Sequence, residues 1–129
     1  MTKNPRVVRE DTNLHEVIAT ISKFDINSLI VVQNDKPVGI LTTRDVLVRG
    51  FEHGLPPSAM TAKMVASSPV ITIDEQATVE EAANLMKRNK IKHLPVTINN
   101  KLVGILSDTD IMFAVPSMLS MMQEVCRQK

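Results

Sequence analysis

Gly39-Ile40-Leu41-Thr42-Thr43-Arg44-Asp45 occurs twice in this chain, returning 65 positions later as Gly104-Ile105-Leu106-Ser107-Asp108-Thr109-Asp110. The similarity extends beyond these seven residues, because residues 8–46 align without a gap with residues 73–111. Such an internal repeat indicates two copies of one small structural unit. Units of roughly 60 residues bury too little surface to be stable alone, so we expect the copies to pack together. Two copies predict two similar cores and two similar clefts.

The composition argues against several classes of protein. The chain has 129 residues and a net charge of +1, so neither a broad basic surface for nucleic acid nor an acidic tail is expected. A single cysteine, Cys126, excludes an intramolecular disulfide bond. The first residues form no apolar signal segment, and no apolar run approaches ~18 residues. We therefore expect a soluble, cytoplasmic protein without a membrane span.

Hydrophobic periodicity predicts the order strand, helix, strand, strand, helix in each copy. In the first copy these elements are expected at 6–9, 14–21, 28–33, 38–42 and from about residue 44. The second copy repeats the helix at 79–86, the hairpin at 94–98 and 103–107, and a last helix from about 108. Asn13 with Glu16, and Thr78 with Glu81, have the spacing of helix caps.

The predicted domain boundaries are 1–58 for the first repeat, 59–115 for the second and 116–129 for a C-terminal amphipathic helix. The segment joining the repeats contains Gly54 and Pro56-Pro57, which favour a loop, and a short helical turn is predicted at 59–65. The last helix begins at Pro116 and is rich in methionine. It either covers the core of its own chain or binds a partner, because methionine surfaces adapt readily.

The repeated motif resembles that of CBS domains (cystathionine β-synthase domains), which occur in tandem as a Bateman module. Two further stretches are typical of the second domain of such pairs, namely Ile91-Lys92-His93-Leu94-Pro95-Val96 and Pro69-Val70-Ile71-Thr72-Ile73. The resemblance covers residues 5–114. It implies an α/β (α+β) fold of two βαββα repeats related by a pseudo-two-fold axis, each with a three-stranded sheet and two helices.

The resemblance also implies a function. CBS pairs are not enzymes; they are regulatory modules that bind adenosine-type ligands (AMP, ADP, ATP or S-adenosylmethionine) in clefts between the repeats. Occupancy of a cleft is transmitted to an attached or partner protein. For this chain we expect an adenine-nucleotide ligand, no required cofactor, no catalytic residue, a homodimer and an unknown effector protein.

The family pattern assigns roles to residues of this chain. Asp45 and Asp110 would bind the ribose hydroxyls, while Thr42 and Ser107 would reach a phosphate. The backbone of Val70, Ile71 and Thr72, with the side chain of Ile91, would hold the adenine edge in the cleft that uses Asp110.

The copies differ at positions that affect ligand charge. The second copy has Lys92, His93 and Pro95 where the first has Asn27, Ser28 and Ile30, and Lys87, Arg88 and Lys90 add charge nearby. Arg44 stands in the first motif where the second has Thr109. We expect the clefts to bind a phosphorylated ligand unequally, with Arg44, Lys92 and His93 as contacts. The alternatives are a solvated helix end for the lysines and a surface position for His93.

The motif itself allows a second interpretation. A carboxylate accepts hydroxyl donors from a cis-diol through charged hydrogen bonds. The same Thr-x-x-Asp or Ser-x-x-Asp spacing also forms a capping box, in which the two side chains satisfy only their own helix. Spacing alone leaves both interpretations open, and the resemblance favours the ligand role.

Other chemistries find little support in the sequence. The histidines and Cys126 lack metal-ligand spacing, so no metal site is expected. The chain contains no nucleophile motif and no glycine-rich phosphate loop. Two alternatives to the sensor remain: a structural interaction module with empty clefts, and a small nucleic-acid-binding protein that uses residues 87–93. Against the nucleic-acid alternative, residues 87–93 contain no phenylalanine, tyrosine or tryptophan side chain of the kind that stacks on bases.

Overall fold

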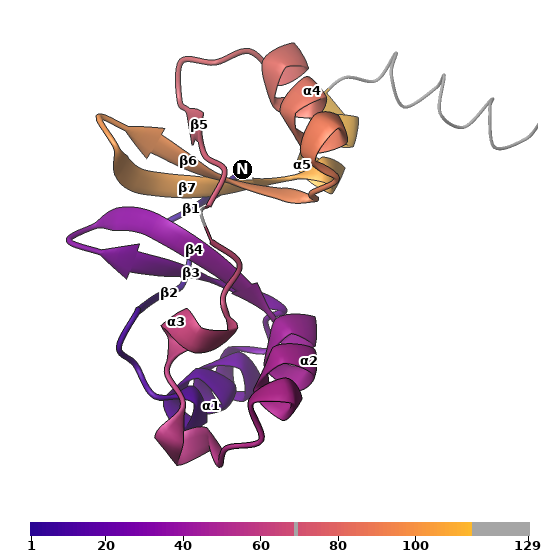
Figure 1. The fold of residues 1–129 in the computed structure, drawn as a ribbon. Coiled ribbons are helices and arrows are strands. Elements are labelled where there is room, and N and C mark those ends of the chain that lie inside the picture. Colours follow the sequence, from indigo (N-terminus) through magenta and orange to yellow (C-terminus); the bar gives the residue numbers. More distant parts are fainter. Residues whose placement is uncertain (69, 115–129) are drawn as a thin grey trace, which may run out of the picture.

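The computed structural model describes residues 1–68 and 70–114. The predicted C-terminal helix from Pro116 lies outside the described residues. Two units with the same order of elements follow one another along the chain (Figure 1), as the internal repeat predicts.

The first unit contains β2 (Val7–Arg9), α1 (Leu14–Phe24), β3 (Ser28–Gln33), β4 (Lys36–Thr42) and α2 (Thr43–His53). The second contains β5 (Ile73–Asp74), α4 (Val79–Asn89), β6 (His93–Ile98), β7 (Lys101–Ser107) and α5 (Asp108–Ala114). Between them lie a 3₁₀ turn, η1 (Pro57–Ala59), and the short helix α3 (Ala62–Val65). The predicted order of elements is confirmed in both units.

Local sequence explains where these elements begin and end. The side chains of Asn13 and Thr78 accept hydrogen bonds of 3.1 Å from the amides of Glu16 and Glu81, which confirms the predicted N-caps. Both helices end at a residue in the left-handed conformation, Asp25 in α1 and Lys90 in α4. The two hairpins turn at Asn34-Asp35 and Asn99-Asn100, whose four positive φ angles suit asparagine and aspartate.

The sheet of the second unit has one strand that the sequence analysis missed. The strand β1 (Thr2–Lys3) pairs antiparallel with β7, so the second sheet has four strands in the order β1-β7-β6-β5, while the first has the predicted three. The first unit has an isolated bridge between Ser67 and Ile40 at the equivalent place. In β1, Thr2 pairs with Ile105, and a shift of 65 positions relates Thr2 to Ser67 and Ile40 to Ile105. The segment that enters each unit therefore first pairs with the sheet of the other.

Two glycines of the repeated motif allow this close approach. A Cβ atom on Gly39 would lie 3.2 Å from the carbonyl oxygen of Ser67, and one on Gly104 would lie 3.0 Å from that of Thr2. Both distances are short for a carbon–oxygen contact. The glycine of each motif therefore has a packing role that is independent of any ligand.

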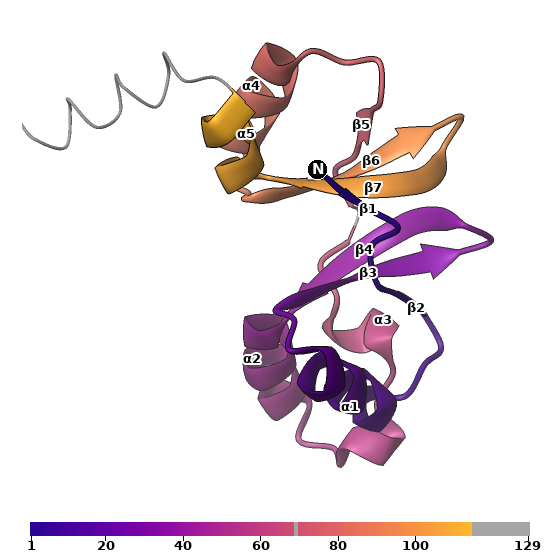
Figure 2. The same cartoon turned by 180° about the vertical axis from the view of Figure 1, so that it is seen from behind.

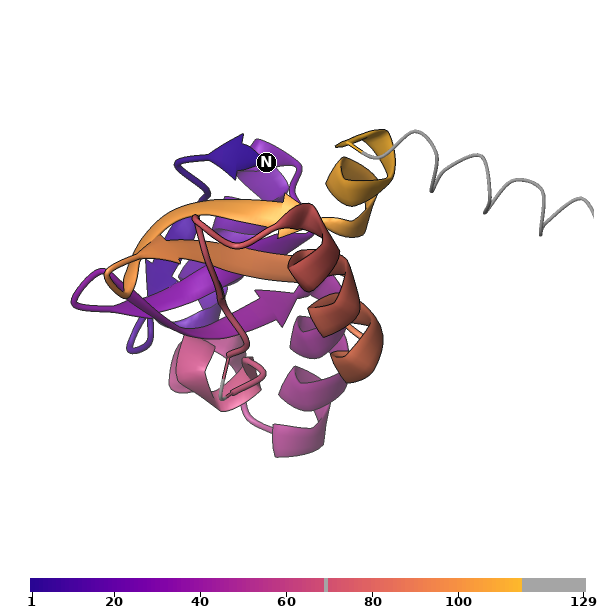
Figure 3. The ribbon, with the colours of Figure 1, turned by 90° about the horizontal axis from the view of Figure 1, so that it is seen from above.

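The two sheets lie next to each other at the centre of the molecule (Figures 1 and 2), with α1, α2 and α3 beside the first sheet and α4 and α5 beside the second. Viewed from above (Figure 3), both hairpin turns point to one side, and helices α2, α4 and α5 lie on the other. In the central strand β3, Leu29 and Val31 belong to the helix-covered core, while Ile30 is equally buried but faces the second unit. Pro95 is the counterpart of Ile30 in β6.

The cores of the two units differ in extent. The first contains side chains from the joining segment, Met60, Ala62, Val65 and Ala66, in addition to those of its own helices and sheet. The second is built around Ala82, Met86, Leu94 and Ile111. The core of the first unit therefore extends past residue 58. The domain boundary between residues 58 and 59 stays a prediction.

Candidate ligand-binding clefts

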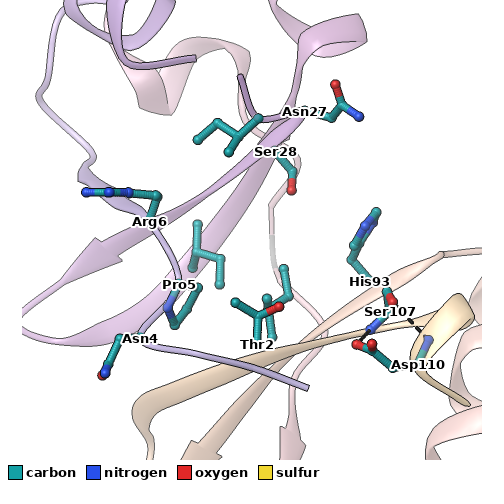
Figure 4. Close-up of a pocket in the computed structure, with 12 residues that line it drawn as sticks. Thr2, Asn4, Pro5, Arg6, Asn27, Ser28, His93, Ser107 and Asp110 are labelled. Atoms are coloured by element: carbon teal, nitrogen blue, oxygen red, sulfur yellow. Dashed lines mark hydrogen bonds between the residues drawn. The ribbon is translucent and has the colours of Figure 1, made fainter. Parts of the chain in front are cut away.

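Two cavities lie between the units, each containing one aspartate of the repeated motif. The Asp110 cleft has a volume of about 420 Å³ and is shown in Figure 4; its lining residues are Thr2, Asn4, Pro5, Arg6, Ile26, Asn27, Ser28, Ile30, His93, Ile105, Ser107 and Asp110. The Asp45 cleft has a volume of about 550 Å³ and is lined by Ile40, Thr42, Arg44, Asp45, Ser67, Val70, Ile71, Lys90, Ile91, Lys92, His93 and Pro95. Both are large enough to hold a nucleoside-sized ligand.

The two clefts are equivalent nearly position by position. A shift of 65 residues carries Pro5 and Arg6 onto Val70 and Ile71, and Ile26 onto Ile91. The same shift relates the two motifs, so each cleft combines the end of a hairpin from one unit with the entry segment of the other. The predicted pair of similar clefts is confirmed as an architectural feature.

In the first unit, Thr42 and Asp45 form a complete capping box at the start of α2. The Asp45 amide donates to Thr42 Oγ1 over 3.2 Å, and Asp45 Oδ2 accepts from the Thr42 amide at 2.9 Å and from the Thr42 hydroxyl at 3.0 Å. The second motif has the same geometry: the Asp110 amide donates to Ser107 Oγ over 3.1 Å, and the Ser107 amide donates to Asp110 Oδ2 over 2.9 Å. The capping interpretation is therefore confirmed for both motifs.

Capping does not use the whole carboxylate. In both motifs the capping bonds that the carboxylate accepts end on Oδ2. The other oxygen of Asp45 lies 4.0 Å from Arg49 Nε, and within the described part of the chain Oδ1 of Asp110 accepts no hydrogen bond from the protein. Both aspartates line a cavity. Each carboxylate can therefore hold its helix and still accept a hydroxyl donor from a ligand, so the two interpretations of the motif are compatible.

The structure corrects one grouping of residues. Val70, Ile71 and Ile91 were expected beside Asp110, but they line the cleft of Asp45 and Thr42. The reason is the bridge between Ser67 and Ile40, in which the Ser67 amide donates to the Ile40 carbonyl over 2.8 Å. This bridge guides the entry segment of the second unit past the first motif, two residues before Thr42. In the same way, the pairing of β1 with β7 places Asn4, Pro5 and Arg6 beside Ser107 and Asp110.

Most of the remaining predicted site residues fall in one place. Arg44, Lys92, His93 and Pro95 line the Asp45 cleft. Thr72, by contrast, is half-buried directly before β5 and lines neither cleft. His93 lines both cavities, and Figure 4 shows it between Ser28 and the Ser107–Asp110 pair.

Sequence reasoning missed one wall of the Asp110 cleft. Asn4, Pro5 and Arg6, with Ile26, Asn27 and Ser28, line this cavity but were not singled out as site residues. The repeat itself carries the missing information, because shifting the expected adenine-edge residues back by 65 positions leads to these segments. In Figure 4 the side chain of Arg6 points away from Asp110, and its guanidinium lies 3.5 Å from the ring centroid of Phe24.

Within 1–68 and 70–114, no helix has the length and apolar character needed to cross a membrane. The same residues contain no group of three or more histidine, cysteine, aspartate or glutamate side chains able to hold a metal ion.

Comparison with known proteins connects this architecture to a family. The model of the family described as "CBS domain" matches residues 1–51 and 62–117, which together form most of the chain. The two matched segments correspond to the two structural units.

Sequence relatives agree with this match. The chain is 31% identical over 107 residues to hypoxic response protein 1 of Mycobacterium tuberculosis, covering 79% of this chain and 75% of that protein. It is 33% identical over 111 residues to an uncharacterized protein of Methanopyrus kandleri, covering 84% of this chain but only 57% of the relative. A match to inosine-5'-monophosphate dehydrogenase of Mycobacterium bovis, at 35% identity, covers 85% of this chain and 20% of the enzyme. That resemblance therefore concerns one part of the enzyme.

Solved structures show the same fold. The crystal structure of hypoxic response protein I with two coordinated zinc ions superposes with a TM-score of 0.82 at 28% identity, covering 89% of this chain and 94% of that one. A putative acetoin utilization protein from Vibrio cholerae gives a TM-score of 0.75 at 28% identity, covering 96% and 92% of the two chains.

Proposed function

This chain belongs to the CBS-domain family, as a tandem pair of such domains, and we propose that it is a regulatory module that senses an adenosine-type ligand such as AMP, ADP or ATP. The ligand binds in the clefts between the two repeats, and its binding alters a partner protein. The proposal includes a cytoplasmic location and no catalytic activity of the chain itself.

One observation carries the proposal: each cleft contains a motif aspartate that caps its helix through Oδ2 alone and leaves Oδ1 outside the capping bonds. Fixed in this way, the carboxylate needs little reorganisation to accept ribose hydroxyls, and a charged hydrogen bond of this kind contributes roughly 1.5–3 kcal/mol. The Asp45 cleft adds apolar side chains, Val70, Ile71 and Ile91, against which an adenine ring packs.

Ligand binding can act on a partner because each cleft is built from both repeats. A ligand that contacts α2 and the entry segment of the second repeat favours one relative arrangement of the repeats over another. A saturating ligand changes the free-energy difference between the two arrangements by the difference between its binding free energies for them. The partner then needs only to distinguish these arrangements.

Isothermal titration calorimetry with AMP, ADP, ATP and S-adenosylmethionine tests the proposal. We expect at least one compound to bind, and Asp45→Ala or Asp110→Ala to abolish binding in the cleft it alters. Each substitution also removes a cap, so circular dichroism must first show that the variant is folded. Asp35→Ala, which changes a carboxylate in an exposed hairpin turn, is the matched control. Absence of binding by all four compounds at millimolar concentration would reject the proposal.

A second candidate function, a structural interaction module, is favoured by the exposed face of α2. Leu47 and Phe51 are 68% and 88% exposed on this helix, Val48 is exposed beside them, and Leu55, two residues after the helix ends, is also exposed. Apolar patches of this kind mark sites of protein association. We propose that this face, named the α2 face from Leu47, Val48, Phe51 and Leu55, forms a homodimer interface. Nucleotide sensing and association through this face are compatible.

A further inference from the structure

The two clefts are built from equivalent segments of the two repeats but differ in charge. The Asp45 cleft is lined by Arg44, Lys90 and Lys92 together with Asp45. The equivalent positions beside the Asp110 cleft carry Thr109, Asp25 and Asn27. The repeat therefore supplies an internal comparison between two clefts of the same fold, in which the number of lining lysine and arginine side chains falls from three to one.

None of the three cations of the Asp45 cleft forms an ion pair with another residue of 1–68 or 70–114. All three are exposed, and the ion pairs of the described residues are Arg9–Asp11 and Arg49–Asp45, which involve none of them. Like charges placed around one cavity repel one another, and an anion bound between them relieves that repulsion. An unpaired cationic group of this kind favours a ligand with several negative charges.

The Asp110 cleft has the opposite character. Its cation, Arg6, is stacked on Phe24 and points away from Asp110 (Figure 4), and no lysine is among the described residues that line this cleft. Asp25 takes the place of Lys90 at the end of α1, in the same left-handed conformation. The described lining of this cleft has one lysine or arginine side chain, Arg6, where that of the Asp45 cleft has three, and this difference disfavours a phosphate chain in the Asp110 cleft.

We infer that the two clefts take ligands of different charge: the Asp45 cleft takes a polyphosphorylated nucleotide, and the Asp110 cleft takes a nucleoside without phosphate groups. The inference rests on the proposed function in treating both cavities as ligand sites. It adds that one chain binds two chemically distinct ligands, one in each cleft, so the duplicated fold can respond to both.

Titration of the ¹⁵N-labelled protein with tripolyphosphate, followed by NMR, tests the anion part without any nucleoside. Tripolyphosphate should shift the amide signals of Thr42 and Ile71 in the Asp45 cleft and leave those of Ile26 and Ser107 in the Asp110 cleft in place. ATP should bind with the same preference for the Asp45 cleft, and adenosine should shift Ile26 and Ser107.

The repeat also supplies the substitutions. Arg44→Thr with Lys92→Asn places the residues of the other repeat in the Asp45 cleft and should weaken tripolyphosphate about a hundredfold, on the order of tenfold per cation. The reciprocal variant, Thr109→Arg with Asn27→Lys, should create tripolyphosphate binding in the Asp110 cleft. Lys36→Thr with Lys101→Asn removes the same charge from the hairpin turns, and its affinity should stay within about twofold because salt screens distant charges.

The outcomes separate this inference from the proposed function. Equal shifts in both clefts, or unchanged affinity in Arg44→Thr with Lys92→Asn, would overturn the charge difference while leaving adenosine sensing intact. Selective binding of tripolyphosphate without binding of any adenosine compound would support the anion site and reject adenosine sensing. No shift with tripolyphosphate, ATP or adenosine would reject both.

Discussion

At the scale of single residues, the motif aspartate and its hydroxyl partner have a structural role that can be measured without a ligand. In the first motif Thr42 Oγ1 accepts from the Asp45 amide and donates to the Asp45 carboxylate. Thr42→Ala removes both interactions, and loss of such an N-cap costs about 1 kcal/mol. Urea unfolding should show a lower midpoint with an unchanged slope.

Ser22→Ala is the matched control for this prediction, because Ser22 is exposed in the last turn of α1, away from its N-cap. Its free energy of unfolding should change by less than about 0.5 kcal/mol. Equal effects of the two substitutions would mean that the capping box contributes nothing to stability and that the motif hydroxyl is present for the ligand alone.

The sequence predicted these local bonds because capping depends on residues three positions apart. It could not predict which cleft receives Asp45. Membership of a cleft depends on Ser67, which pairs with Ile40, 27 positions earlier in the chain, and no short-range pattern specifies that pairing. Val70, Ile71 and Ile91 were therefore identified as a group but assigned to the wrong aspartate.

At the scale of elements, the motif glycines control how the entry segments cross to the opposite sheet. A side chain at Gly39 would meet Ser67 and the Cβ of Ala66, which belongs to the first core. A side chain at Gly104 would meet Met1 and Thr2 of the two-residue strand β1. Gly39→Val should therefore destabilise the protein by roughly 1–3 kcal/mol through overpacking, and Gly104→Val by less, because it displaces fewer buried contacts.

Hydrogen exchange gives the sharper measurement for Gly104→Val. Protection should fall at the β1–β7 pair and persist in the β6–β7 hairpin. Unchanged protection of β1 in the variant would show that Gly104 is not needed for the crossing. Sequence analysis missed β1 because two residues have no periodicity, although the Thr2–Ser67 equivalence becomes evident once the repeat is extended upstream.

At the scale of the whole molecule, helices α2, α4 and α5 lie on the side opposite the hairpin turns (Figure 3), so an interface on one side leaves the other free. The α2 face is on the helical side. Each Phe51 buried at a two-fold contact contributes roughly 1.5–3 kcal/mol, and the symmetry of a homodimer counts this contribution twice. Phe51→Asp should therefore weaken dimerisation by at least about a hundredfold.

Sedimentation equilibrium of the wild type and the variant measures this effect directly. Ile98→Asp, on the side of the hairpin turns, is the matched control, because Ile98 is also exposed and receives the same charge. It should leave the dimer unaffected. A wild-type protein that is monomeric at micromolar concentration, or a variant as dimeric as the wild type, would exclude the α2 face as a self-association surface. Since α2 begins at the motif that contains Asp45, a dimer formed through this face would connect the occupancy of the Asp45 cleft to the neighbouring copy through a single helix.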